Sequence, residues 1–163
     1  MKTMLHFVIC CTLLLSLWGC TSKVDTSDFQ RADSTSTSPP NIIFLIGDGM
    51  GHSQLSTVFY FKQDAFLGSF PVVGISHTKS ASNKITDSAA GATAFASGKK
   101  TTNGYIGMDA DGKPLPLITD LLSERGYNTG IVSTSSITHA TPAAYYAHIN
   151  DRDKEFEIAT FLP

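Results

Sequence analysis

The chain has 163 residues, of which 42% are hydrophobic and 16% are charged, and its formal net charge at pH 7 is −2. Such a composition is typical of a globular protein and argues against a disordered, collagen-like or nucleic-acid-binding chain. We therefore expect a folded domain with no nucleic acid partner.

Residues 1–19 are predicted to be a secretory signal peptide. Lys2 gives the start a positive charge, and the apolar run that follows, 4–18, is short for a membrane span. The ending Leu-Trp-Gly-Cys, 17–20, resembles the lipobox of bacterial lipoproteins, in which the cysteine becomes the lipid-modified first residue of the mature protein. Acyl chains on Cys20 would hold the protein on a membrane of the cell envelope, in the periplasm or at the outer membrane. An ordinary cleaved signal with a chance cysteine is the alternative.

Residues 20–40 are predicted to be the lipidated cysteine and a flexible tether. This stretch is rich in Ser, Thr and Asp, has very few large apolar residues and ends in two prolines. Cys10 and Cys11 lie in the leader, so the mature chain would keep no thiol except Cys20. A disulfide framework and a thiolate metal site are therefore not expected, and the folded domain would comprise residues 41–163.

Apolar runs typical of buried strands alternate along this domain with segments typical of helices. Asp87 or Thr86 is the predicted N-cap of one helix, and Gly98 is its predicted stop. The alternation predicts an α/β domain with a mainly parallel sheet. In chain order we expect a strand at 41–47, a helix at 53–62, a strand at 72–78, helices at 88–97 and 115–125, a strand at 128–133, and helical segments at 143–148 and 151–162.

Two candidate functional residues adjoin these elements. Asp48 follows directly after the first predicted strand, and the ligand sites of open α/β sheets lie just beyond the carboxyl ends of the strands. Ser88 opens a predicted helix made largely of Ala and Gly, where the free N–H groups and the positive end of the helix dipole favour an anion such as phosphate. A capped, buried helix with an incidental serine is the alternative.

A serine hydroxyl is a weak nucleophile unless a base or a metal ion activates it. The sequence has no Gly-x-Ser-x-Gly motif, which argues against a Ser-His-Asp triad. It does offer Asp48, the cluster His139-Ala-Thr141-Pro and Arg152. Oxygen and imidazole ligands together with an arginine are the parts of a metal-assisted phosphoryl site, and the planar fork of arginine can hold two phosphoryl oxygens.

Four motifs together resemble the alkaline phosphatases. They occur in the family's order and at its spacings, and they are Ile46–Gly51, Thr86–Ala90, Lys100–Gly104, and Thr138–Pro142 followed by Arg152. The resemblance implies a three-layer α/β/α fold with a mainly parallel central sheet, incomplete here, residues 41–163 being the N-terminal part of the catalytic domain. It also implies hydrolysis of phosphate monoesters through a phosphoserine intermediate, with two zinc ions and a third metal site that usually holds magnesium.

The resemblance implies a role for each matched residue. Ser88 would be the nucleophile, with its alkoxide stabilised by a zinc ion, and Asp48 would bridge that zinc ion and the third metal site. Arg152 would clamp the non-bridging phosphoryl oxygens, and Asp87 would orient its guanidinium. Thr141 would supply a hydroxyl to the third metal site.

Histidine at position 139 departs from part of the family. Some bacterial members carry aspartate there and animal enzymes carry histidine, so the third metal site resembles the histidine type. Because imidazole is a softer ligand than carboxylate, His139 weakens the case for tight Mg²⁺ and leaves Zn²⁺ or Co²⁺ open. His148 is predicted to be a packed or hydrogen-bonded residue, and Lys99 and Lys100 to form a solvated basic turn.

The remaining metal ligands of the family have no counterpart in this sequence. Arg152 is followed by Asp153, Glu155 and Glu157, whose helical spacing is typical of a solvated helix face, and by no histidine. We therefore expect an N-terminal fragment without phosphatase activity of its own. Two alternatives stay open: a related superfamily enzyme that cleaves phosphodiesters, and a non-catalytic, truncated surface lipoprotein that binds phosphate or a partner. The Thr-Asp-Ser-Ala-Ala motif argues against the first alternative, and homodimerisation is a family expectation.

Overall fold

The computed structural model describes residues 40–162. The predicted leader, the predicted lipidation site Cys20 and almost all of the predicted tether lie outside the described residues. The chain divides into two units, 1–44 and 45–163, and every helix described below belongs to the second unit. Within residues 40–162, each helix is too short or too polar to cross a membrane.

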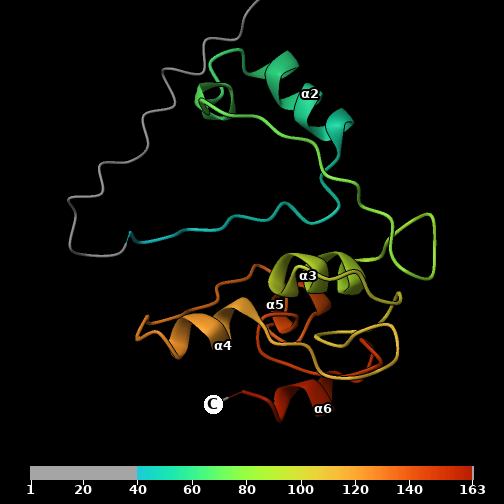
Figure 1. Cartoon of the computed structure of the whole chain (residues 1–163). Coiled ribbons are helices and arrows are strands. Elements are labelled where there is room, and N and C mark those ends of the chain that lie inside the picture. Colours follow the sequence, from blue (N-terminus) through green and yellow to red (C-terminus); the bar gives the residue numbers. More distant parts are fainter. Residues whose placement is uncertain (1–39, 163) are drawn as a thin grey trace, which may run out of the picture. The chain divides into compact units, whose positions relative to one another are not determined.

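The helices of the described unit follow the predicted positions, although several are shorter than predicted (Figure 1). The helices predicted at 53–62 and 88–97 are found with their bounds within one residue, and the one predicted at 115–125 is confined to its centre. The segment predicted at 143–148 forms its helix a turn earlier. In chain order the elements are α2 (His52–Phe61), the 3₁₀ helix η2 (Phe66–Ser69), α3 (Ser88–Ser97), α4 (Ile118–Ser123), α5 (Ala140–Ala143) and α6 (Glu155–Ala159).

Helix α3 begins and ends where its sequence predicts. The Asp87 carboxylate accepts a hydrogen bond from the Ala90 backbone N–H at 2.9 Å, so Asp87 is the N-cap. The Thr86 hydroxyl instead donates to the Asp87 carbonyl at 3.0 Å. Gly98 ends the helix in the left-handed conformation with φ +72°, which glycine adopts without steric cost. The choice between Asp87 and Thr86 as the cap is thus settled in favour of the residue directly before Ser88.

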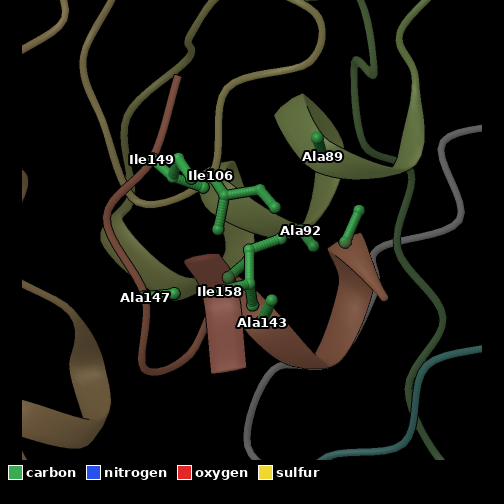
Figure 2. Packing of buried hydrophobic residues seen from close by; sticks show 9 residues of the cluster. Ala89, Ala92, Ile106, Ala143, Ala147, Ile149 and Ile158 are labelled. Atoms are coloured by element: carbon green, nitrogen blue, oxygen red, sulfur yellow. The ribbon is translucent and has the colours of Figure 1, made fainter. Parts of the chain in front are cut away.

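The core explains why α3 consists of small residues. Helix α3 packs against α5, and alanines from both helices meet at this contact because their side chains allow the two backbones to approach closely (Figure 2). Larger side chains from three other segments complete the cluster. Its buried members are Ala89, Ala92, Ile106, Ala140, Ala143, Ala144, Ala147, Ile149 and Ile158.

One pair of backbone hydrogen bonds joins the segment after α3 to the segment after α5 across this core. Ile106 and Ile149 form an isolated antiparallel bridge, in which each N–H donates to the other's carbonyl, at 2.8 and 2.9 Å. Both side chains lie in the buried cluster. The bridge therefore brings the segment after α3 against the segment after α5, and Arg152 follows only three residues after Ile149.

The predicted strands are not formed in the described part of the chain. Residues 40–162 contain isolated bridges but no β-strand, and the segments 41–47, 72–78 and 128–133 lie outside any helix or strand. Most of their apolar side chains are exposed, for example Val73 at 88% and Val132 at 100%. A strand of a parallel sheet needs neighbouring strands for its hydrogen bonds and helices over both faces. Because the described residues supply neither to these segments, the three strand predictions are wrong for this structure.

Tyr145 packs against the core, and burial raises the pKa of its phenol from 10.0 to about 12. In the unfolded chain the phenol would ionise near its ordinary pKa, so the folded state holds the proton over a pH range where the unfolded state has lost it. The contribution of Tyr145 to the free energy of unfolding is therefore present below pH 10 and is lost as the pH rises from 10 to about 12.

Urea unfolding at several pH values tests this prediction. Over this pH range, the free energy of unfolding should fall less for Tyr145→Phe than for the unmodified chain. Tyr60, which is 80% exposed, provides the control substitution Tyr60→Phe. Equal pH dependence in Tyr145→Phe and the unmodified chain would contradict this prediction.

Candidate functional site

Asp48 joins two residues that lie far from it in the sequence. The Ser88 hydroxyl donates to Asp48 Oδ1 at 2.9 Å across 40 residues, and the Thr141 hydroxyl donates to Asp48 Oδ2 at 2.7 Å across 93 residues. Ser88 is the first residue of α3, and Thr141 is the second residue of α5. The packing of α3 against α5 thus brings two of the predicted site residues, Ser88 and Thr141, to the carboxylate of a third, Asp48.

The turn that carries Asp48 depends on Gly49. Gly49 has φ +67°, a conformation that side chains other than glycine rarely adopt, and the Met50 N–H closes the turn on the Gly47 carbonyl at 3.1 Å. The loop then enters α2 at His52. The Gly-Asp-Gly-Met pattern therefore has a structural reason, because the glycine after Asp48 lets the chain reverse while the carboxylate points at α3 and α5.

The surroundings of Asp48 favour its charged form. The hydrogen bond from Thr141 is the main cause that lowers the pKa of Asp48, and partial burial opposes it. The hydrogen bond from Ser88 and the nearby charge of Arg152 lower this pKa further. Asp48 is therefore an ionised carboxylate whose two oxygens face hydroxyl groups, which is a donor set suited to a hard cation.

A second group of contacts surrounds Asp87 and Arg152. Arg152 Nη1 lies 3.2 Å from Asp87 Oδ2, and this same oxygen accepts a hydrogen bond from the Gly104 N–H at 2.9 Å. The other carboxylate oxygen of Asp87 caps α3. The Asp87 carboxylate is therefore held by backbone N–H groups of α3 and of Gly104. It gives the guanidinium of Arg152 a fixed partner, and Asp87 is the residue directly before Ser88. The side chains of this ion pair are both about one quarter exposed, at 26% and 24%, so that an anion can reach them.

His139 lies at the edge of both groups. Arg152 Nη2 is 3.3 Å from His139 Nε2, and because guanidinium is only a donor, the geometry assigns the acceptor role to Nε2 and the proton to Nδ1. Nδ1 is buried and has no hydrogen-bond partner among the described residues. An unpaired buried donor is unfavourable, so Nδ1–H lacks a hydrogen-bond acceptor that residues 40–162 would have to supply.

The described residues provide only part of a metal cage. Among residues 40–162, no three His, Cys, Asp or Glu side chains come close enough together to hold an ion. The donors at the site are the carboxylate of Asp48, the imidazole of His139 and the hydroxyls of Ser88 and Thr141. These residue types fit metal ions that prefer oxygen and imidazole ligands, but they would leave such ions incompletely coordinated.

Other residues considered from the sequence lie outside this group. The ammonium of Lys100 donates to the backbone carbonyls of His77, at 2.6 Å, and of Lys79, so it ties down a loop, while Lys99 and Lys100 are exposed as predicted. His148 Nδ1 lies 2.7 Å from the Gly107 carbonyl, which confirms the prediction of a hydrogen-bonded residue.

Two residues that support the site were not assigned a role from the sequence. Asn103 donates to the Ile85 carbonyl at 3.0 Å and accepts from the Asp87 N–H at 3.4 Å, so it holds the segment that enters α3. Its position inside the matched motif at 100–104 was the signal that could have found it. Glu155 was predicted to be a solvated-face charge, yet it contacts the turn before α5. No local pattern points to that contact, because its partners are 17 and 19 residues away.

Comparison with known proteins decides the family. The family model described as alkaline phosphatase matches residues 40–160, which include every residue of the site. The chain belongs to the alkaline phosphatase family. The repressible alkaline phosphatase of Saccharomyces cerevisiae is 37% identical to it over 98% of this chain and 29% of that relative.

Solved alkaline phosphatases share the fold. The enzyme from the Antarctic bacterium TAB5 is 46% identical, with a TM-score of 0.67 over 69% of this chain and 33% of that one. A variant of the TAB5 enzyme in which a histidine is replaced by aspartate has Mg bound in its M3 site. These comparisons confirm the α/β fold class of alkaline phosphatases for the part covered, and the chain spans about a third or less of the length of these relatives.

Proposed function

We propose that this chain supplies the nucleophile, the phosphate clamp and part of the metal cage of an alkaline phosphatase that hydrolyses phosphate monoesters through a phosphoserine intermediate. The observation that carries the proposal is the convergence of Ser88 and Thr141 on the ionised carboxylate of Asp48, with Arg152 held beside them by Asp87. Membership of the alkaline phosphatase family supports the same reaction.

The residues of this chain account for several parts of that reaction. Ser88 Oγ would form the new bond to phosphorus while the bond from phosphorus to the ester oxygen breaks, and its proton is already directed at Asp48. The N-terminal N–H groups of α3 and the guanidinium of Arg152 would stabilise the negative charge of the phosphoryl oxygens. Water would then cleave the serine phosphate and release inorganic phosphate, which regenerates the hydroxyl.

The metal ions proposed for this site are two Zn²⁺ and a third metal. Asp48, Ser88, His139 and Thr141 would supply ligands, and the bound ions would lower the pKa of the serine hydroxyl and stabilise the leaving alkoxide. In the TAB5 relative, the variant with Mg in its M3 site carries aspartate in place of a histidine. Because carboxylate suits Mg²⁺ better than imidazole does, a third site that includes His139 is proposed to favour Zn²⁺ or Co²⁺ over Mg²⁺.

The incomplete donor set leads to a second part of the proposal. Since Asp48 and His139 have no third acidic or histidine neighbour among residues 40–162, catalysis would need metal ligands from further polypeptide. We therefore propose that the chain acts as the N-terminal part of a larger enzyme. A lipid anchor on Cys20, a place in the cell envelope and a homodimeric assembly complete the proposal, and the mass of the N-terminal peptide from a bacterial expression host would test the anchor.

A chimeric enzyme tests the proposal. Residues 40–160 would replace the matched segment of the TAB5 alkaline phosphatase, and p-nitrophenyl phosphate hydrolysis would be measured with and without Zn²⁺. We expect zinc-dependent turnover from the chimera and none above background from the 163-residue chain, because only the chimera has the complete set of metal ligands. A folded chimera that binds phosphate without turning over the monoester would favour the non-catalytic lipoprotein, and preferential cleavage of bis(p-nitrophenyl) phosphate would favour the phosphodiesterase.

A further inference from the structure

The turn that precedes α5 is held by a carboxylate from α6. The hydroxyl of Ser136 donates to Glu155 Oε2 at 3.0 Å, and the hydroxyl of Thr138 donates to the same oxygen. Within the turn, the His139 N–H donates to the Ser136 carbonyl at 3.0 Å. His139, a residue of the candidate site, directly follows Thr138, so Glu155 contacts the residue next to the site.

Glu155 is attached to a well-anchored part of the molecule. It is the first residue of α6, and Ile158, one turn later on the same side of that helix, is fully buried. Ile158 lies in the cluster that also contains Ala140 and Ala143 of α5 (Figure 2). Helix α6 therefore shares the buried core with α5 through Ile158, and through Glu155 it contacts the turn that leads into α5.

A second side chain, that of Tyr146, also contacts this turn. The phenol of Tyr146 donates to the Ile137 carbonyl at 2.9 Å, so the turn is held by Tyr146, by Glu155 and by its own backbone hydrogen bond. The bonds from Thr138 and Ser136 are also the main causes that lower the pKa of Glu155. The carboxylate is thus charged at neutral pH and acts as an acceptor for both hydroxyls.

The neighbouring Glu157 shows what an ordinary surface carboxylate does on the same helix. Its side chain lies 3.3 Å from the ammonium of Lys154, three residues earlier, and both side chains are largely exposed. Such a pair within one helix contributes little to stability and positions nothing outside the helix. Glu155 differs because its donors come from another segment, next to His139.

We propose that Glu155 is a positioning residue of the site: its carboxylate fixes the turn 136–139, and through this turn it places His139 beside Arg152 and Thr141 beside Asp48. The proposal rests on the proposed function to the extent that it assigns His139 and Thr141 to a phosphatase site. The positioning itself is a property of the folded chain and is measurable without turnover.

Amide hydrogen exchange of the 163-residue chain tests this role. In Glu155→Ala both hydroxyls lose their acceptor, and we expect the His139 amide to exchange about tenfold faster or more, while the amides of α3 keep their rates. In Glu155→Gln the amide oxygen can accept from both hydroxyls at the place of Oε2, so the His139 amide should exchange within about threefold of the unmodified rate. Glu157→Ala is the matched control on the same helix and should leave the His139 amide unchanged.

Three results would overturn the proposal. An unchanged His139 amide in Glu155→Ala would mean that the contact holds nothing in place. Equal acceleration of the α3 amides would mean that Glu155 contributes to global stability instead of to the turn. Acceleration in Glu155→Gln as large as in Glu155→Ala would show that the charge acts without the hydrogen bonds. Because none of these measurements uses catalysis, a failure here differs from an inactive chimera, which would count against the proposed function.

Discussion

Replacing Ser88 by alanine is expected to lower the zinc-dependent monoester turnover of the chimera by on the order of 10⁴-fold or more, because the hydroxyl that attacks phosphorus is lost. The fold should tolerate the change. Ser88 is the first residue of α3, alanine is a good helix former, and the hydrogen bond to Asp48 is at an exposed position. The measurement is kcat/KM for p-nitrophenyl phosphate, with circular dichroism to show that the variant is folded.

Ser97 supplies the matched control for Ser88. It is the last residue of the same helix, and its hydroxyl donates to the Thr93 carbonyl at 2.7 Å, at the opposite end of α3 from Asp48. Ser97→Ala should therefore keep turnover close to that of the parent chimera. Acid quenching in the presence of labelled phosphate should trap label on the parent and not on Ser88→Ala. A Ser88→Ala chimera within tenfold of the parent rate would refute the assignment of the nucleophile.

Gly107→Ala is expected to destabilise the folded chain by about 3 kcal/mol or more, because the new methyl group would meet backbone that has no room to move. Gly107 has φ +60°, and a Cβ atom there would lie 2.1 Å from the Ala147 carbonyl oxygen and 2.9 Å from His148 Nδ1. The Gly107 N–H also donates to the Thr93 hydroxyl at 2.9 Å inside the core. Relief of the clash would pull this loop away from α3 and from the segment after α5.

Gly104→Ala separates the clash from the backbone strain. Gly104 has φ +85°, but a Cβ atom there would have nothing within 4 Å. Its substitution should cost only about 1 kcal/mol, the strain of a positive φ. Urea unfolding of both variants measures the difference in the free energy of unfolding, and equal losses in the two would show that the contact with Ala147 does not matter.

The limits of helix α3 were predictable because they depend on neighbouring residues. A carboxylate three residues before Ala90 caps the helix, and Gly98 ends it in the left-handed conformation. The run of alanines predicted close packing, and α5 is what it packs against. Helices α4 and α6 are shorter than the apolar spacing alone predicts.

The three predicted strands show the opposite case. The apolar runs at 41–47, 72–78 and 128–133 have the composition of buried strands, but a strand exists only where another strand bonds to it. The described residues do not bring any two of these runs together as a ladder. Composition thus indicates which segments suit a sheet, whereas partners elsewhere in the polypeptide decide whether the sheet forms.

By itself, the sequence of this protein determined the short-range features: the capped helix that presents Ser88, the glycine turn after Asp48, and the motifs that identify an alkaline phosphatase. Only the tertiary structure decided which side chains meet. Asp48 accepts hydrogen bonds from Ser88 and Thr141, which are 40 and 93 residues away. Glu155 accepts hydrogen bonds from the turn before His139, although its helical spacing in the sequence predicts an ordinary surface charge. The physical reason is that turn and cap preferences are local energies of a few residues, while long-range contacts form only when core packing offsets the entropy of closing the intervening loops.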